Sequence, residues 1–199
     1  MIHFNENILV AVDVETTGVD CAFHDLVQIG CLPLEPLTLD PHPTLRPFYQ
    51  NIRPRNPERA QKAAMAVNGL DMDELLLCPT VEEVTDAFHD WFRSLGLPVG
   101  KRLIPLTHNS PFDIPFMQQF LGQDVFYDCF TRRGRDTMYM ALGINDSYIW
   151  KGLAAPFNEC GLKPLCNHFG IDISGHHDAL ADCIATSQVY RELLRMEHP

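Results

Sequence analysis

Residues 8–15 read Ile-Leu-Val-Ala-Val-Asp-Val-Glu, a short apolar run that ends on two acids. Such a run predicts a buried strand. Because a strand sends residues i and i+2 to the same face, Asp13 and Glu15 are expected to lie side by side. Two neighbouring carboxylates repel each other unless a cation lies between them. A lone pair of this kind is common at solvent-exposed strand ends, but this pair ends a core strand, where α/β folds carry their sites.

The rest of the chain is β-rich in its first third and then alternates between helix and strand patterns. Further strands are predicted at residues 24–33, 46–53 and 103–106, and helices at 57–67, 81–95, 110–121 and 178–196. Thr80 and Glu83 form a capping box at the start of the second helix, and repeated prolines make 34–47 a connecting loop. This order predicts a single mixed α/β domain over residues 1–199, with a partly parallel sheet.

A second acidic site follows the strand predicted at 103–106. There the chain reads His108-Asn109-Ser110-Pro111-Phe112-Asp113, which places Asp113 in the first turn of a helix. A carboxylate is favoured at that position by the helix dipole alone, and His108 and Asn109 also suit a turn. Asp113 therefore gains a ligand role mainly from the acids elsewhere in the chain.

A third site opens the last helix, where the chain reads His176-His177-Asp178-Ala179-Leu180-Ala181-Asp182. A helix that begins near Asp178 places Asp182 one turn in, with His177 at the helix entrance. Asp178 is better explained as the helix cap than as a ligand. His176 is assigned to the preceding turn, so His177 is preferred as the catalytic histidine.

The three sites together supply the groups needed for two-metal hydrolysis of a phosphodiester. They are Asp13, Glu15, Asp113, Asp182 and His177. Mg²⁺ and Mn²⁺ prefer carboxylate oxygens and water, and two such ions clamp the attacking and leaving oxygens. A histidine can deprotonate the attacking water near neutral pH. The sequence holds no nucleophile elbow, zinc-protease helix or P-loop that would compete.

Composition limits the setting of this site. The chain has 199 residues, 46% of them hydrophobic, and a formal net charge of −11. It holds no apolar run long enough for a membrane span and no secretory signal pattern, which predicts a cytoplasmic protein without membrane contact. Seven cysteines without metal-finger spacing predict reduced, mostly buried thiols. The acidic charge is unfavourable for generic binding of nucleic acid but compatible with a short substrate.

In order and spacing, the three sites resemble the DEDDh exonucleases, the family of the bacterial polymerase proofreading subunit and of RNase T. The matching pieces are residues 12–18, residues 108–113 and His177 with Asp182, with softer matches at 67–70 and 162–171. The resemblance implies an RNase H-like fold, a mixed five-stranded sheet flanked by helices. It also implies two Mg²⁺ or Mn²⁺ ions on the four acids, with Asp13 shared, and release of 5′-mononucleotides from the 3′ end of single-stranded DNA or RNA.

The resemblance further implies a set of substrate contacts. They are Thr16, Thr17, His108, Asn109 and Phe112. Thr107 stands where relatives often have glycine, and Val19 and Val67 stand where RNase T has phenylalanines, so RNase T-like specificity is not implied. The chain ends about one turn after the last predicted helix, so we expect no tail of the kind that contacts a polymerase. A homodimer is left open.

Two other functions fit the same residues. One is an oligoribonuclease-like enzyme for very short RNAs, which the acidic charge favours. The other is an inactive nucleic-acid or polymerase-binding module, which the complete set of acids disfavours. Two segments have no counterpart in the resemblance: the basic residues 131–135 are a solvated loop or a phosphate contact, and the aromatic loop 148–157 is core packing or a base-stacking surface.

Overall fold

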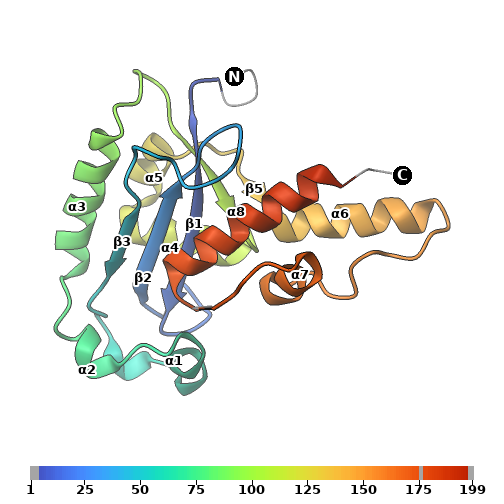
Figure 1. The fold of residues 1–199 in the computed structure, drawn as a ribbon. Helices are drawn as coiled ribbons and strands as arrows, with labels where there is room; N and C mark the ends of the chain where they lie inside the picture. The colour runs from blue at the N-terminus through green and yellow to red at the C-terminus, as the bar shows by residue number, and fades with distance from the viewer. Residues whose placement is uncertain (1–4, 175–176, 197–199) are drawn as a thin grey trace.

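The computed structural model describes residues 5–174 and 177–196 (Figure 1). A five-stranded sheet in the order β3-β2-β1-β4-β5 runs through its centre. Its strands are β1 (Ile8–Thr16), β2 (Leu26–Pro33), β3 (Phe48–Asn51), β4 (Leu103–Thr107) and β5 (Arg135–Asp136). The helices are α1 (Lys62–Asn68), α2 (Met72–Leu75), α3 (Val81–Ser94), α4 (Ser110–Leu121), α5 (Gln123–Cys129), α6 (Thr137–Trp150), α7 (Leu162–Phe169) and α8 (Ala179–Arg195), with a 3-10 turn η1 (Pro57–Arg59). The predicted mixed five-stranded sheet flanked by helices is confirmed. Among the described helices, none is both long and apolar enough to cross a membrane.

The apolar strand β1 occupies the middle of the sheet. It pairs antiparallel with β2 from Val10 to Thr16, but parallel with β4 only from Ile8 to Ala11. The end of β1 that carries the first acids therefore extends beyond β4. Backbone groups on that side need other hydrogen-bond partners, which leaves room for the start of a helix.

Helices cover both faces of this sheet (Figure 1). On one face α3, α4 and α5 pack aromatic and aliphatic side chains against the strands. On the other face α8 packs Cys183 and Tyr190 against β1 and β4, and α6 and α7 pack against α8. The first turn of α8 lies so close to β2 that a Cβ atom at Gly30 would come within 2.7 Å of the Ala179 carbonyl oxygen. This contact fixes the height of α8 over the sheet.

Local sequence signals are confirmed at some positions and wrong at others. Thr80 accepts the N–H of Glu83, whose carboxylate accepts the N–H of Thr80, so the predicted capping box is present. The continuous helix predicted at 57–67 is wrong, because it divides into η1 and α1. Gln61 has extended backbone between them and donates its N–H to the Thr17 carbonyl at 2.8 Å. A tertiary hydrogen bond thus overrides the helical pattern.

The segment predicted as an aromatic loop at 148–157 is partly helical. Its first three residues form the end of α6. Phe157 is 3% exposed and belongs to the core between α6, α7 and α8, whereas Trp150 is 90% exposed. Core packing therefore explains Phe157 but not Trp150.

Candidate active site

The three acidic segments converge at the end of β1 that extends beyond β4. Asp13 and Glu15 come from β1, and Asp113 and Asp182 come from the first turns of α4 and α8. All four line one pocket of about 400 Å³, and His177 lines it as well. Asp113 and Asp182 are 2% and 5% exposed, whereas the two acids of β1 are half-buried. Five residues from three segments that lie far apart in the sequence thus share one cavity.

Asp113 is held by the unpaired side of β1. Its carboxylate accepts the N–H of Val14 at 3.3 Å, beyond the point where β1 and β4 stop pairing. Asn109, the N-cap of α4, lies in the left-handed region, with φ 75°. Pro111 stands in the first turn, where its missing N–H costs no helical hydrogen bond. This geometry of the first turn of α4 points the Asp113 side chain toward β1.

Side chains of the sheet fix the start of α8. Asp178 accepts two backbone N–H groups of the first turn, both at 3.1 Å, and Tyr49 donates its hydroxyl to the same carboxylate. Gln28 accepts the N–H of Ala179 at 2.8 Å. The predicted cap role of Asp178 is confirmed. Asp182 follows one turn later and reaches the pocket.

His177 precedes this cap in a rare backbone conformation. Its φ is 72°, in the left-handed region that non-glycine residues seldom adopt. Its N–H donates to the Asp182 carboxylate at 3.3 Å. Backbone strain of this kind persists only where the surrounding structure holds it, and it clusters at functional sites. His176, the less favoured candidate, lies outside the described residues.

Burial and mutual repulsion disfavour negative charge in this cluster. Burial raises the pKa of Glu15 to about 8, and the charges of Asp182 and Asp113 add to the effect. Burial also raises the pKa of Asp13 well above its usual range, again with help from Asp113 and Asp182. The pKa of Asp113 is raised by burial, although a backbone hydrogen bond opposes the change. Near neutral pH the cluster therefore binds protons unless a cation replaces them.

The donor atoms of the cluster fit a hard divalent cation. One oxygen of Glu15, one oxygen of Asp182 and one ring nitrogen of His177 lie within 4.8 Å of one another. Carboxylate oxygens are the protein ligands that Mg²⁺ and Mn²⁺ prefer. A cation among these acids lowers their pKa values again, because an opposite charge favours the ionised carboxylate. The donor chemistry therefore suits a metal centre.

The other walls of the pocket are mainly apolar. Val19 and Val67 line it and are 72% and 54% exposed. Phe112 and Leu162 line it as well, and Leu162 is buried. The pocket thus combines an acidic end with apolar side chains at its rim.

The structure divides the predicted substrate contacts into two groups. Thr16, His108 and Phe112 line the cavity. Thr17 is fully buried, and its hydroxyl accepts the N–H of Asp25 at 2.9 Å. Asn109 is the N-cap of α4, and its backbone N–H donates to the Asp136 carboxylate at 3.4 Å. Contact of Thr17 and Asn109 with a substrate stays a prediction.

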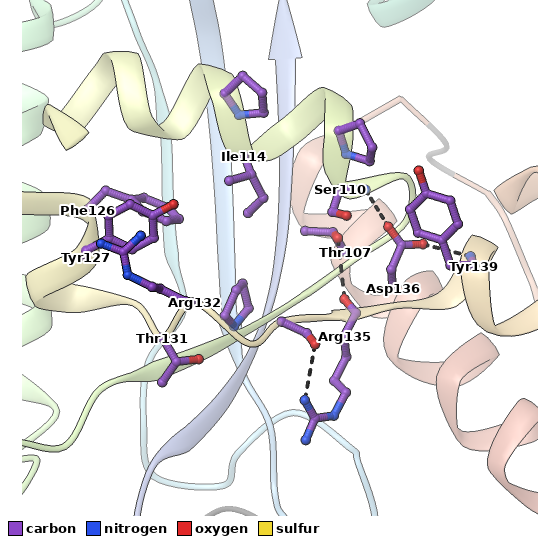
Figure 2. Close-up of a pocket in the computed structure, with 14 residues that line it drawn as sticks. Thr107, Ser110, Ile114, Phe126, Tyr127, Thr131, Arg132, Arg135, Asp136 and Tyr139 are labelled. Carbon is purple, nitrogen blue, oxygen red and sulfur yellow. Dashed lines mark hydrogen bonds between the residues drawn. The ribbon is translucent and has the colours of Figure 1, made fainter. Parts of the chain in front are cut away.

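Asp136 helps to build the site, although sequence reasoning did not select it. One oxygen accepts the N–H of Tyr139 at 3.0 Å and caps α6, and the other accepts the N–H of Ser110 at 2.5 Å at the start of α4 (Figure 2). The neighbouring Thr137 hydroxyl is 2.7 Å from Nδ1 of His108. An aspartate before an apolar run is a helix-cap signal that marks such a position. The bond to Ser110 joins residues distant in sequence, which no local pattern reports.

A five-stranded sheet in this order, flanked by helices, is an RNase H-like fold, and the carboxylate cluster lies at the end of its central strand. The model of the RNase T exonuclease family matches residues 10–190, and the chain belongs to this exonuclease family. The DNA polymerase III subunit epsilon of Rickettsia felis is 28% identical over 188 residues, which make up 92% of this chain and 72% of that protein. A PolC-type DNA polymerase III of Oceanobacillus iheyensis is 23% identical across 96% of this chain, which spans 12% of its length.

Solved nuclease structures share the fold. The exonuclease I of Methylocaldum szegediense superimposes with a TM-score of 0.71 at 24% identity, over 95% of this chain and 40% of that one. Cell-death related nuclease 4 superimposes with a TM-score of 0.73 at 17% identity, over 96% of this chain and 64% of that one. The chain thus spans less than half the length of exonuclease I.

Proposed function

We propose that this chain is a metal-dependent 3′→5′ exonuclease that releases 5′-mononucleotides from single-stranded DNA or RNA, with residues 1–199 acting as one domain. The convergence of four carboxylates and His177 in one pocket carries the proposal. Membership of the exonuclease family supports it.

The carboxylates act as metal ligands in this proposal. Asp13, Glu15, Asp113 and Asp182 hold two Mg²⁺ or Mn²⁺ ions, with Asp13 shared between them. Bound ions of this kind neutralise the charge that develops on the phosphoryl and leaving oxygens during hydrolysis. The raised pKa values support the assignment, because burial in a pocket without a cation opposes ionisation of these acids.

His177 acts as the general base that accepts a proton from the attacking water. It lines the pocket beside the acids, and its backbone is tied to Asp182. An imidazole changes protonation near neutral pH, which suits proton transfer at that pH. General-base catalysis of this kind contributes about 10²–10⁴-fold to the rate.

The apolar rim binds the terminal base. Val19, Val67 and Phe112 offer surfaces for stacking or packing against a base. The pocket volume of about 400 Å³ lies in the usual range for small ligands. One terminal nucleotide therefore fits with its base at the rim and its phosphate toward the acids, and it enters most easily from an unpaired strand.

A second candidate is an oligoribonuclease-like activity on very short RNAs. The net charge of −11 favours it, because a short substrate brings few phosphates near an acidic surface. A third is an inactive binding module on the same fold.

Product analysis separates these functions. DNA and RNA oligonucleotides with a 5′ label, both very short and about twenty nucleotides long, are incubated single- and double-stranded with Mg²⁺ or with chelator. We expect a ladder that shortens from the 3′ end only with metal. Activity confined to the shortest RNAs selects the second candidate, and retained binding without any shortening selects the third. Shortening from the 5′ end contradicts the proposal.

A further inference from the structure

A second cavity lies on the other side of the start of α4. It measures about 490 Å³. Ser110 and Pro111 line this cavity, whereas His108 and Phe112 of the same segment line the active-site pocket. A single turn of chain therefore separates the two cavities.

The rim of this second cavity is basic, although the protein is acidic. Arg132 and Arg135 line the cavity, and Arg133 is exposed between them in sequence. The guanidinium of Arg132 lies over the ring of Tyr127, with 3.9 Å between its carbon and the ring centroid (Figure 2). Stacking uses the face of a guanidinium and leaves its N–H groups available to phosphate oxygens. Within residues 5–174 and 177–196, none of the three arginines forms an ion pair.

The rest of the cavity lining is mainly apolar and aromatic. The apolar side chains of Pro105, Ile114 and Phe126 line the cavity. Tyr139, which is 53% exposed, lies on the opposite side of the cavity from Arg132 (Figure 2). The acid in this lining, Asp136, accepts backbone N–H groups with both of its oxygens, which compensates its charge. Apolar side chains, an exposed ring and an arginine rim match the base and the phosphates of a nucleotide.

We propose that this cavity binds an upstream part of the strand whose 3′ end lies in the active site. The Tyr139 ring and the apolar side chains receive a base, and Arg132 and Arg135, which line the cavity, receive backbone phosphates. The strand reaches the cavity by crossing the turn at Pro111. This inference rests on the proposed exonuclease function and adds to it a preference for longer strands.

Substrate length therefore reports on the second cavity. A dinucleotide is too short to extend beyond the active-site pocket, whereas a strand of about ten nucleotides, at about 3.4 Å per nucleotide, is long enough to reach both cavities. Arginines on the rim attract phosphates that the acidic surface elsewhere repels. The KM of the ten-nucleotide strand is accordingly lower than that of the dinucleotide.

The test compares Arg132→Gln/Arg135→Gln with Arg93→Gln/Arg195→Gln on both substrates. The control removes the same charge from two exposed arginines on α3 and α8, whose side chains are 73% and 64% exposed. We expect the first variant to raise the KM of the ten-nucleotide strand about tenfold and to leave the dinucleotide KM and kcat unchanged. Its slope of log KM against log salt falls by about 1.4, for two phosphate contacts on a single strand. The control variant changes neither the KM of the ten-nucleotide strand nor its salt slope.

Tyr139→Ala separates base stacking from charge. Tyr139 is exposed, and its backbone N–H still donates to the Asp136 carboxylate that caps α6, so the variant keeps its fold. It raises the KM of the longer strand without changing the salt slope.

Two outcomes overturn the second cavity as a strand site while the exonuclease stands. One is a ten-nucleotide KM that is equal in the wild type and the Arg132→Gln/Arg135→Gln variant. The other is an equal rise in KM for both substrates, which places the arginines at the active-site pocket. A wild type that hydrolyses neither substrate overturns the proposed function itself, and the second cavity as a strand site with it.

Discussion

Removal of the Glu15 carboxylate is expected to stabilise the metal-free protein above neutral pH. The pKa of Glu15 is about 8 in the folded chain, against an ordinary value of 4.5. A raised carboxyl pKa means that the folded state binds the proton more tightly than the unfolded chain, so the free energy of unfolding falls as pH rises from about 4.5 through 8. The slope is at most about 1.4 kcal/mol per pH unit and flattens near both pKa values, so the loss from Glu15 between pH 5 and pH 8 is roughly 3.5 kcal/mol. Glutamine keeps the shape of the side chain and does not titrate.

Urea unfolding in chelator across this pH range measures the effect. We expect the wild type to lose stability with rising pH and Glu15→Gln to lose roughly 3.5 kcal/mol less. Asp13 and Asp113 leave a residual slope in the variant. Glu58→Gln on η1, where the side chain is 69% exposed, controls for the loss of one negative charge. Mg²⁺ should recover more stability in the wild type than in Glu15→Gln. Identical pH dependence in the two proteins refutes the reasoning, because Glu15 then ionises without cost.

Three further changes probe other parts of the site. His177→Ala should lower kcat by about 10²–10⁴-fold while Mn²⁺ still binds, measured by turnover and calorimetry; unchanged kcat would remove His177 as the base. Gln28→Ala should lower the free energy of unfolding by about 1–2 kcal/mol and also lower kcat, because the N–H of Ala179 loses its partner at the start of α8; a change in stability alone would separate Gln28 from the site. Gly30→Ala should cost about 1–3 kcal/mol through its contact with Ala179. Gly143→Ala, whose Cβ meets no heavy atom within 4 Å, should gain up to about 1 kcal/mol; equal melting temperatures of the two glycine variants would contradict the close contact.

The parts of the site that depend on local geometry could be predicted from the sequence. Asp13 and Glu15 share a face because strand periodicity dictates it. Asp178 caps α8 because its side chain reaches backbone groups two and three residues ahead. Asp113 is different, since its hydrogen bond to Val14 spans 99 residues. That bond exists because β1 extends beyond β4, a fact of sheet pairing that no local pattern contains.

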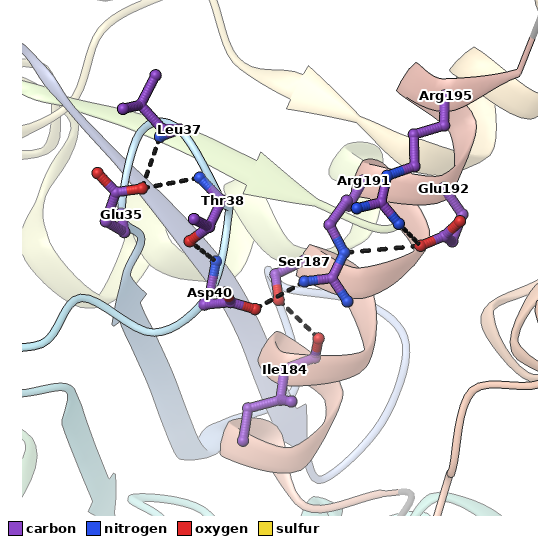
Figure 3. Close-up of polar contacts among 9 residues, drawn as sticks. All are labelled: Glu35, Leu37, Thr38, Asp40, Ile184, Ser187, Arg191, Glu192 and Arg195. Atoms are coloured by element: carbon purple, nitrogen blue, oxygen red, sulfur yellow. Dashed lines mark hydrogen bonds and ion pairs between the residues drawn. The ribbon is translucent and has the colours of Figure 1, made fainter.

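Tertiary contacts account for most of what sequence reasoning did not find. The sequence does not predict the break at Gln61 or the hydrogen bonds of Asp136 to the starts of α4 and α6. It also gives no individual bounds for α5, α6 and α7. The sequence predicts the proline-rich segment 34–47 as a loop, but it does not predict the contact that holds this loop against the rest of the fold. An ion pair of 2.6 Å between Arg191 and Asp40 ties this loop to α8 (Figure 3). Such an ion pair forms because the fold brings two residues together that lie far apart in the sequence, so no pattern of neighbouring residues predicts it.

Hydrolysis of a 5′-labelled single strand by Asp13→Ala tests the role of the acidic cluster most directly. Asp128→Ala, at an exposed acid outside the pocket, is the matched control. We predict that Asp13→Ala in Mg²⁺ shortens the strand no faster than the wild type in chelator, while Asp128→Ala shortens it from the 3′ end at the wild-type rate. An Asp13→Ala protein that retains the wild-type rate would contradict a metal-dependent exonuclease centred on these four acids.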